Sequence, residues 1–590
     1  MNRLVYIKRL YILCVLVSAN LLSSAQWNND TISGGNHLIR NISKTSKQIS
    51  VADRTGGNFV VFEKAEIDAF GYTTGRHAIC LQQINSNGQT QFGTLDSGTV
   101  LIPTAGVRLS DMVSDSNGGF YFAYRMDIYS SNDQFLGTSL FVQRVNASGT
   151  LVWSGNGTEI FSTLGYYEYE PTLISLPANQ VAVAWVEPAS DSYNGYLRVQ
   201  KLSGTGQLQW GTFGTRVSNN PVGYVHNFSV TNDGSGGLLF TYEDDRNAPP
   251  LPTPGQEFTD LFFQRVRSNG TLALDPNGVP VFVENFDQML PLRDGKQRTS
   301  FPDGSGGQYI LYGTALNENS DSTDIYVQRI SATGQKLFAG NGVKIAQDGQ
   351  DGYYIYELFL IPSENNSISC YFQRTNPDSF IFQSKLFYVQ KINTSGQKFW
   401  NTTYGYLIDR AWSDDGEFTD PFDVAWDSAG NHMITYLRYI GDTSSQVVVQ
   451  YLNAAGVKQL AASGKTILAA SAVKLDINRN SDGYFMVNWQ DLRNYPESTM
   501  VWDPPTDLFT KRINAQGQAT GERRTIYSQA TGNWNNPSTW QGGVVPTIAD
   551  EVIVRHQVTV TAAAGSYSLR VETAAGRILV QAGMNLQVVH

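Results

Sequence analysis

Aromatic and acidic residues occur together in several segments that interrupt an otherwise regular chain. Two of these segments read Gly-Tyr-Tyr-Glu-Tyr-Glu at 165–170 and Asp-Gly-Tyr-Tyr-Ile-Tyr-Glu at 351–357. Aromatic rings stack on sugar rings, carboxylates accept hydrogen bonds from sugar hydroxyls, and Tyr and Trp anchor protein interfaces. The alternative is that several of these tyrosines begin strands and are buried. The side chains predicted to bind a ligand are Tyr166, Tyr167, Tyr353, Tyr354, Trp412 and Trp502.

Sequence motifs of common enzymes are missing from the chain. It has no His-Glu-x-x-His, no Gly-x-Ser-x-Gly elbow of the hydrolase kind and no phosphate-binding Gly-Lys-Ser/Thr loop. The six histidines are scattered singly, so a histidine-rich metal site would require several distant segments to converge. We therefore name no catalytic or metal-binding residue and expect no cofactor. Calcium at the acidic segment 414–420 is kept as an alternative, although its spacing matches no known loop.

One segment recurs along most of the chain. Its clearest copy is Tyr-Val-Gln-Arg-Ile-Ser-Ala-Thr-Gly at 326–334, and close copies occupy 141–149 and 388–396. Eight such copies end in a glycine, and successive glycines lie 57 to 64 residues apart. A fixed period of this length indicates a repeat architecture. The eight glycines are Gly88, Gly149, Gly206, Gly270, Gly334, Gly396, Gly456 and Gly517.

Each repeat carries four short strand patterns, which we call A to D, separated by Gly, Asn, Asp and Ser turns. Strand B is nearly continuously apolar, as in Val-Ala-Val-Ala-Trp at 181–185, which indicates a strand covered on both faces. Four antiparallel strands per repeat are typical of a propeller blade. We predict an all-β chain with an eight-repeat β-propeller. A seven-bladed ring with one displaced copy is the alternative.

Two recurring features are predicted to be structural. The Asp-Gly-Ser-Gly-Gly turns at 233–237 and 303–307 could hold calcium or form the Asp-box of sialidase-like propellers, but they lack the Thr-Trp of that box. Asp and Gly are common turn formers, which explains them more simply. A Gln recurs in seven of the eight copies, and a residue present in so many copies serves the scaffold. These glutamines are Gln82, Gln143, Gln200, Gln264, Gln328, Gln390 and Gln450.

Loop lengths distinguish the two faces of the predicted ring. The A–B and C–D turns are short and uniform, whereas the B–C and D–A connections are long and varied. These longer connections lie on one face, where we expect the ligand to bind. Segment 27–39 resembles a stray strand D, as at 210–217. We therefore expect the first and last blades to share strands and close the ring.

The ends of the chain differ from the repeats. Residues 1–25 have a basic start, an apolar stretch and a small-residue cleavage site, which predicts a signal peptide and a secreted or cell-surface protein. The propeller is expected over 26–527 and a small β module, either β-helix-like or a β-sandwich, over 528–590. A net charge of −10 without a basic cluster argues against nucleic acid as a partner. We expect no membrane span and a monomer.

Two resemblances follow from these motifs. The Asp-Gly-Ser-Gly-Gly turns, Gln-Asp-Leu-Arg at 490–493 and the segment 326–334 resemble exported repeat proteins of the Bacteroidetes type, over nearly the whole mature chain. The pattern Gly-x-Trp-x5-Trp-x-Gly-Gly-x-x-Pro at 532–546 is similar to the start of G8-like surface modules, which are linked to carbohydrate and adhesion contexts. Neither resemblance carries a catalytic residue to this chain.

Three functions remain open. The first is a non-catalytic binding or adhesion protein that recognises a glycan or an extracellular protein. The second is a propeller-type glycoside hydrolase or polysaccharide lyase that uses loop carboxylates such as Asp414 or Glu170. The third is a structural spacer in a surface adhesin. Two carboxylates facing each other across the central channel would favour the enzyme, whereas an aromatic rim would favour binding.

Overall fold

The structure is a computed structural model that describes most of the chain after the predicted signal peptide. The described residues are 27, 35–43, 47–67, 73–94, 98–103, 106–132, 134–164, 170–188, 195–219, 224–247, 259–283, 288–290, 298–315, 323–347, 354–375, 383–400, 404–413, 422–439, 445–469, 472–492, 505–520, 525–547, 550–566, 568–573 and 575–588. Contacts divide the chain into two compact units, with Asp30–Gly517 in one and Met1–Asn29 and Gln518–His590 in the other. The division falls a little before the expected boundary at 527.

The described strands of the larger unit form seven antiparallel sheets. One of these sheets has eight strands, because Gly195 of β12 pairs with Val225 of β14, and we number its two halves as blades 3 and 4 so that each sequence repeat corresponds to one group of strands. Blade 1 contains β2 (Gln48–Ala52), β3 (Asn58–Ile67), β4 (Thr73–Ile84) and β5 (Thr99–Ile102). Blade 2 contains β6 (Val107–Ser114), β7 (Phe120–Tyr129), β8 (Phe135–Val145) and β9 (Thr158–Leu164). Blade 3 contains β10 (Thr172–Leu176), β11 (Gln180–Pro188), β12 (Gly195–Leu202) and β13 (Thr215–Arg216). Blade 4 contains β14 (Val225–Asn232), β15 (Leu238–Asp244), β16 (Asp260–Val266) and β17 (Val279–Phe282).

The second half of the ring continues the same order. Blade 5 contains β18 (Gln288–Met289), β19 (Ser300–Pro302), β20 (Gln308–Ala315), β21 (Thr323–Ile330) and β22 (Val343–Gln347). Blade 6 contains β23 (Tyr354–Pro362), the 3₁₀ turn η2 (Glu364–Asn366), β24 (Ile368–Thr375), β25 (Gln383–Ile392) and β26 (Tyr406–Ser413). Blade 7 contains β27 (Phe422–Trp426), β28 (His432–Tyr439), β29 (Ser445–Leu452) and β30 (Lys465–Ala469). Blade 8 contains β31 (Ala472–Arg479), β32 (Phe485–Asp491), β33 (Pro505–Ile513) and β1 (Asn36–Ser43).

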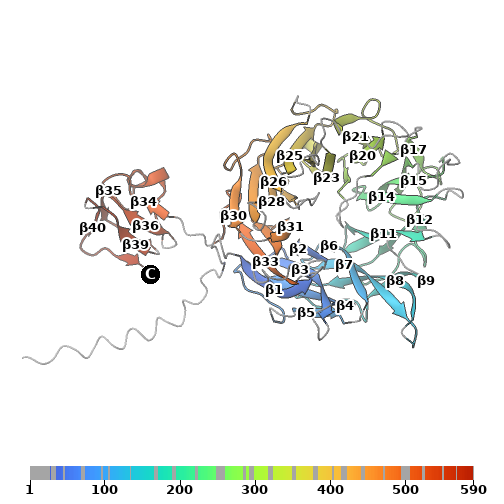
Figure 1. Ribbon diagram of the computed structural model, residues 1–590, viewed down its shortest axis with the longest axis horizontal. Helices are drawn as coiled ribbons and strands as arrows, with labels where there is room; N and C mark the ends of the chain where they lie inside the picture. Colours follow the sequence, from blue (N-terminus) through green and yellow to red (C-terminus); the bar gives the residue numbers. More distant parts are fainter. Residues whose placement is uncertain are drawn as a thin grey trace, which may run out of the picture. The chain divides into compact units, whose positions relative to one another are not determined.

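One strand of each blade lies innermost, and these inner strands surround the axis of the ring (Figure 1). Around the ring, β2, β6, β10, β14, β19, β23, β27 and β31 are neighbours in this order, and β31 returns to β2. The second strand of a blade packs against both adjacent blades, which explains its continuous burial in β15 and β32. The prediction of an all-β propeller is confirmed.

The N-terminal strand closes the ring, as expected, and it lies at the end of the predicted segment. Strand β1 pairs antiparallel with β33, from Asn36 opposite Thr510 to Ser43 opposite Pro505. The described strand covers Asn36–Ser43, so it overlaps the end of the predicted segment 27–39 and extends four residues beyond it. Gly35 has a φ of +97° and a Cβ there would lie 2.5 Å from the ring of Trp489, so only glycine fits at the entry to the strand.

The recurring glutamine joins strand C to the segment that follows it. In blade 2, the Gln143 side chain donates to the Trp153 carbonyl (3.0 Å) and accepts from the backbone N–H groups of Trp153 (3.2 Å) and Arg144 (2.8 Å). Blades 5 and 6 repeat this arrangement at Gln328 and Gln390. The prediction that this residue is structural is confirmed.

The Asp-Gly-Ser-Gly-Gly turns are also held by hydrogen bonds within the blade. Asp233 accepts from the backbone N–H groups of Ser235 (2.8 Å) and Gly237 (2.9 Å), and Arg265 donates to its second oxygen at 2.7 Å. Burial alone would raise the pKa of the Asp233 carboxyl, but the hydrogen bonds from Ser235, Arg265 and Gly237 hold it below its ordinary value. The turn aspartate therefore fastens strand A to strand C.

The smaller unit is a short parallel β-helix. Its strands stack in three parallel sheets, β34–β36–β39, β35–β37–β40 and β38–β41. Trp534 and Trp540 fill its core. Parallel pairing favours the β-helix alternative over a sandwich. Its elements are β34 (Thr525–Tyr527), β35 (Gly532–Asn533), η3 (Pro537–Thr539), η4 (Gln541–Gly543), β36 (Glu551–Val554), β37 (Gln557–Val560), β38 (Ala564–Ser566), β39 (Ser568–Val571), β40 (Arg577–Val580) and β41 (Leu586–Val588).

Candidate functional site

A cavity of about 470 Å³ lies in the central channel of the propeller. Its size falls within the range of small-ligand sites. Seven of the inner strands contribute to its wall, namely β2, β6, β10, β14, β19, β27 and β31, together with Arg298 just before β19. Its described lining residues with polar side chains are Ser50, Asp111, Thr172, Ser175, Thr231, Asn232, Arg298, Ser300, Asp476 and Asn478.

The inner strands explain why these side chains are mostly small. Adjacent side chains of a strand point to opposite faces, and the apolar ones of the inner strands fill the cores between blades. The strands converge on the ring axis, which leaves little room between them. In β10, Leu173 and Ile174 are buried in these cores whereas Ser175 is exposed to the channel. The polar part of the wall consists largely of small hydroxyl and amide side chains of the inner strands.

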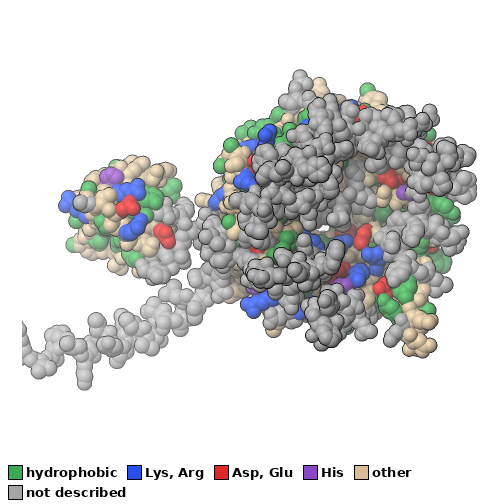
Figure 2. All heavy atoms as spheres, viewed as in Figure 1, with side chains coloured by type: hydrophobic (Ala, Val, Ile, Leu, Met, Phe, Trp, Pro, Cys, Tyr) green, Lys and Arg blue, Asp and Glu red, His purple; other side chains and the backbone are tan. Residues whose placement is uncertain are grey.

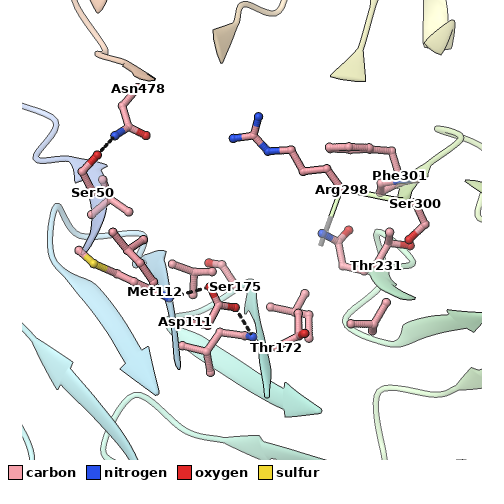
Figure 3. A pocket seen from close by; sticks show the side chains of 18 of the residues that line it. Ser50, Asp111, Met112, Thr172, Ser175, Thr231, Arg298, Ser300, Phe301 and Asn478 are labelled. Atoms are coloured by element: carbon pink, nitrogen blue, oxygen red, sulfur yellow. Dashed lines mark hydrogen bonds between the residues drawn. The ribbon is translucent and has the colours of Figure 1, made fainter. Parts of the chain in front are cut away.

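The Arg298 side chain extends from blade 5, past the inner strand of blade 6, to hydrogen-bond partners in blade 7. Its Nη1 atom donates to a carboxylate oxygen of Asp423 at 2.7 Å and to the carbonyl of Val424 at 3.1 Å, both on β27 of blade 7. The Asp423 side chain is buried, and Arg298 is 18% exposed. Charge-assisted hydrogen bonds of this kind are stronger than neutral ones, so they fix the guanidinium. Figure 3 shows the guanidinium directed into the cavity.

Aromatic rings surround the same side chain. The guanidinium carbon lies 5.6 Å from the ring centre of Trp426 and 5.8 Å from that of Phe359. Phe301 meets Trp426 edge-on, with ring centres 5.8 Å apart. Cations over aromatic faces are stabilised by the ring quadrupole. Trp426 and Phe301 both line the cavity, so the wall near Arg298 combines a cation with apolar ring surface.

Asp111 lies on the wall opposite Arg298 in Figure 3 and connects two blades. Its carboxylate accepts from the backbone N–H of Met112 at 2.7 Å and from that of Leu173, in the next blade, at 2.7 Å. Burial raises the pKa of the Asp111 carboxyl to about 6, because the charged form is poorly solvated there and its hydrogen bonds only partly compensate.

The remaining carboxylate of the cavity belongs to a polar network where blade 8 meets blade 1. Ser50 on β2 hydrogen-bonds to Asp476 and Asn478, both on β31. Asn488 on β32 donates to the hydroxyl of Ser50 at 2.9 Å and to Asp476 at 3.3 Å. The Oδ2 atom of Asp476 thus accepts hydrogen bonds from Ser50 and Asn488, and this network connects the last blade to the first.

A second charged cluster spans blades 1 to 3. The Lys47 ammonium donates to the Ser110 carbonyl at 2.6 Å and pairs with Glu170 at 3.1 Å, and Arg125 pairs with the other Glu170 oxygen at 3.1 Å. Figure 2 shows acidic and basic side chains beside the central opening of the ring. Glu170, one of the carboxylates considered for catalysis, is therefore engaged by two cations.

Most residues predicted to bind ligand lie outside the described part of the chain. This is the case for Tyr166, Tyr167, Tyr353, Trp502 and also Asp414. Tyr354 is the first residue of β23 and Trp412 lies in β26, but their side chains are not described. The role of the long loops stays a prediction. Within the described residues, no group of three or more His, Cys, Asp or Glu is arranged to hold a metal ion.

The cavity was missed in the sequence, although a signal for it exists. Asp111 and Asp476 are each a polar residue within a short strand A that also contains apolar residues, as is Ser50. Only the ring reveals that these positions converge, because they lie in different repeats of the sequence.

Comparison with known proteins gives no family. No protein-family model matches the chain. No curated protein matches it either. Among solved structures, a protein of unknown function from Dyadobacter fermentans is 9% identical, with a TM-score of 0.32, over 81% of this chain and 97% of that one. An α-L-arabinofuranosidase from Fusarium graminearum is 10% identical, with a TM-score of 0.31, over 68% and 93%.

An endo-arabinase from Bacteroides thetaiotaomicron is also similar, at 10% identity and a TM-score of 0.24, over 58% of this chain and 94% of that one. The resemblances to Bacteroidetes-type exported proteins and to G8-like modules stay predictions. The described residues include no helix with the length and apolar character needed to cross a membrane.

Proposed function

We propose that the chain is an exported, non-catalytic binding protein that recognises a glycan, with the central cavity as part of the binding surface. The combination of groups on the cavity wall is the observation that carries this proposal. Hydroxyl and amide side chains from several blades surround a space that Trp426, Phe301 and Arg298 also line. Glycan recognition needs polar groups in fixed positions together with aromatic ring surface.

The state of the cavity carboxylates supports binding without catalysis. Both oxygens of Asp111 accept backbone N–H groups, and Asp476 accepts from Ser50 and Asn488. A nucleophile or a general acid must reach the substrate. Protein donors already hydrogen-bond to these carboxylates, so we infer that their main role is to connect neighbouring blades. The proposal of a secreted or cell-surface protein rests on the predicted signal peptide, and we propose a monomer as well.

The test is a glycan-array screen of residues 26–590 with and without calcium. Ser175 faces the channel from β10 and is exposed, so Ser175→Trp fills the cavity. Ser148, exposed in the turn after β8, provides the matched control Ser148→Trp. We expect binding to one polysaccharide class that Ser175→Trp abolishes and Ser148→Trp leaves unchanged. Binding lost only in Tyr353→Ala, Tyr354→Ala or Trp412→Ala would move the site to the long loops, and no binding would favour a protein partner.

One observation favours the alternative of a glycoside hydrolase or polysaccharide lyase. The raised pKa of Asp111, about 6, is a property of general acids. Release of reducing ends or unsaturated products from a polysaccharide, lost in Asp111→Asn, would establish the enzyme. Binding without product release would support the non-catalytic proposal.

A further inference from the structure

Arg298 differs from every other described residue that lines the cavity, because it alone carries a cationic side chain. A guanidinium has five N–H donors. The Nη1 atom is used for Asp423 and Val424, and no hydrogen-bond partner of Nε or Nη2 is found within the described ranges. The edge formed by Nε and Nη2 is the one that binds carboxylates with two parallel hydrogen bonds.

We propose that the cavity prefers glycans that carry a carboxylate, such as uronate-containing oligosaccharides, and that Arg298 binds this carboxylate. The inference rests on the proposed function and deepens it. Asp423 and Val424 hold one side of the guanidinium, and Trp426 and Phe359 flank it, so its orientation is fixed before a ligand arrives. A preorganised donor loses little side-chain entropy on binding.

The acidic residues nearby limit how strong this preference can be. Asp423 already neutralises part of the Arg298 charge, and Asp111 and Asp476 also line the cavity. Both oxygens of Asp111 and the Oδ2 atom of Asp476 accept hydrogen bonds from protein donors, and Figure 3 places Asp111 across the cavity from Arg298. We therefore expect a selective contact and not a general affinity for anions.

The experiment measures binding of oligogalacturonate and of the same oligosaccharide fully methyl-esterified to residues 26–590 by calorimetry. Esterification removes the negative charge but retains the hydroxyls and the ring. A charge-assisted hydrogen-bonded pair corresponds to roughly tenfold to hundredfold in affinity. We expect the acid to bind more tightly than the ester by about this factor, and Arg298→Gln to remove the difference.

Two further variants separate ligand binding from folding. Arg298→Gln leaves Asp423 buried without its cation, so the double variant Arg298→Gln/Asp423→Asn restores a neutral pair. It should keep the melting temperature close to that of the wild type and lose the preference for the acid. Arg267→Gln changes an exposed arginine in the turn after β16 and should retain the preference.

The outcomes distinguish this inference from the proposed function. Equal binding of the acid and the ester by the wild type would overturn the carboxylate preference and leave glycan binding intact. A preference that persists in the double variant would overturn the role of Arg298. If neither oligosaccharide binds, the uronate inference fails, and the array decides separately whether the protein binds another glycan.

Discussion

At the residue scale, His432 makes the propeller sensitive to acid. Its Nδ1 atom accepts from the Tyr371 hydroxyl at 2.6 Å, and its Nε2 atom lies 3.1 Å from the Pro362 carbonyl, which only an N–H donor can satisfy. Burial lowers the pKa of His432 from 6.5 to about 4. Between these values the unfolded chain binds more protons than the folded one, so the free energy of unfolding falls as the pH falls.

We therefore expect His432→Gln to lose less stability than the wild type between pH 7 and pH 4.5, by about 2–3 kcal/mol. Urea unfolding at both pH values measures this difference. Asp111 acts in the opposite direction, because its pKa is raised from 3.8 to about 6 and its contribution to stability is lost as the pH rises through that range. The comparison of variant with wild type isolates the histidine, and identical pH profiles would contradict its role.

The recurring glutamine gives a second prediction at this scale. Gln143→Ala removes the partner of the Trp153 carbonyl and of two backbone N–H groups inside blade 2. Leaving such groups unsatisfied costs about 1–3 kcal/mol. We expect a matching loss of stability in chemical denaturation. Gln209→Ala is the control, since Gln209 is exposed and its side chain donates to the Gln207 carbonyl on the surface. Equal losses in both variants would show that the bridge contributes nothing.

At the element scale, strand β1 closes the ring. It covers the edge of β33 and buries Leu38, Ile39 and Ile42. A chain that begins at Lys44 would expose this edge, and an open edge pairs with other strands. We expect the shortened chain to melt at a lower temperature and to bind a synthetic peptide of residues 35–46, measured by fluorescence anisotropy.

The control for this prediction is the same peptide with Leu38→Asp, which keeps the backbone donors and acceptors but places a charge in the core. It should bind far more weakly. If both peptides bind equally, pairing at the edge is non-specific. If neither binds and the shortened chain melts like the wild type, β1 is dispensable for the ring.

The elements that could be predicted are those with a repeated local pattern. The Gln-Arg segment and the Asp-Gly turns recur with the same residue types. An interpretation of one copy therefore predicts the strands and side-chain hydrogen bonds of the others. The closing strand occurs only once, so no second copy fixes its bounds. The sequence therefore predicts the segment 27–39, whereas the described strand covers Asn36–Ser43. The positions that face the channel were not predictable, because both faces of an inner strand pack against neighbouring blades, as Leu173 and Ile174 do, and alternation therefore does not mark the residues that meet the axis.

At the scale of the whole molecule, the two compact units should unfold separately. Among the described strands, every sheet lies entirely within one unit, with antiparallel blades in Asp30–Gly517 and parallel coils in Gln518–His590. Units that share no sheet lose their hydrogen bonds independently, so a single two-state transition is not expected. Calorimetry of residues 26–590 should show two transitions, and residues 30–517 alone should reproduce one of them. A single transition at a temperature that the shorter chain does not reproduce would mean that the β-helix stabilises the ring.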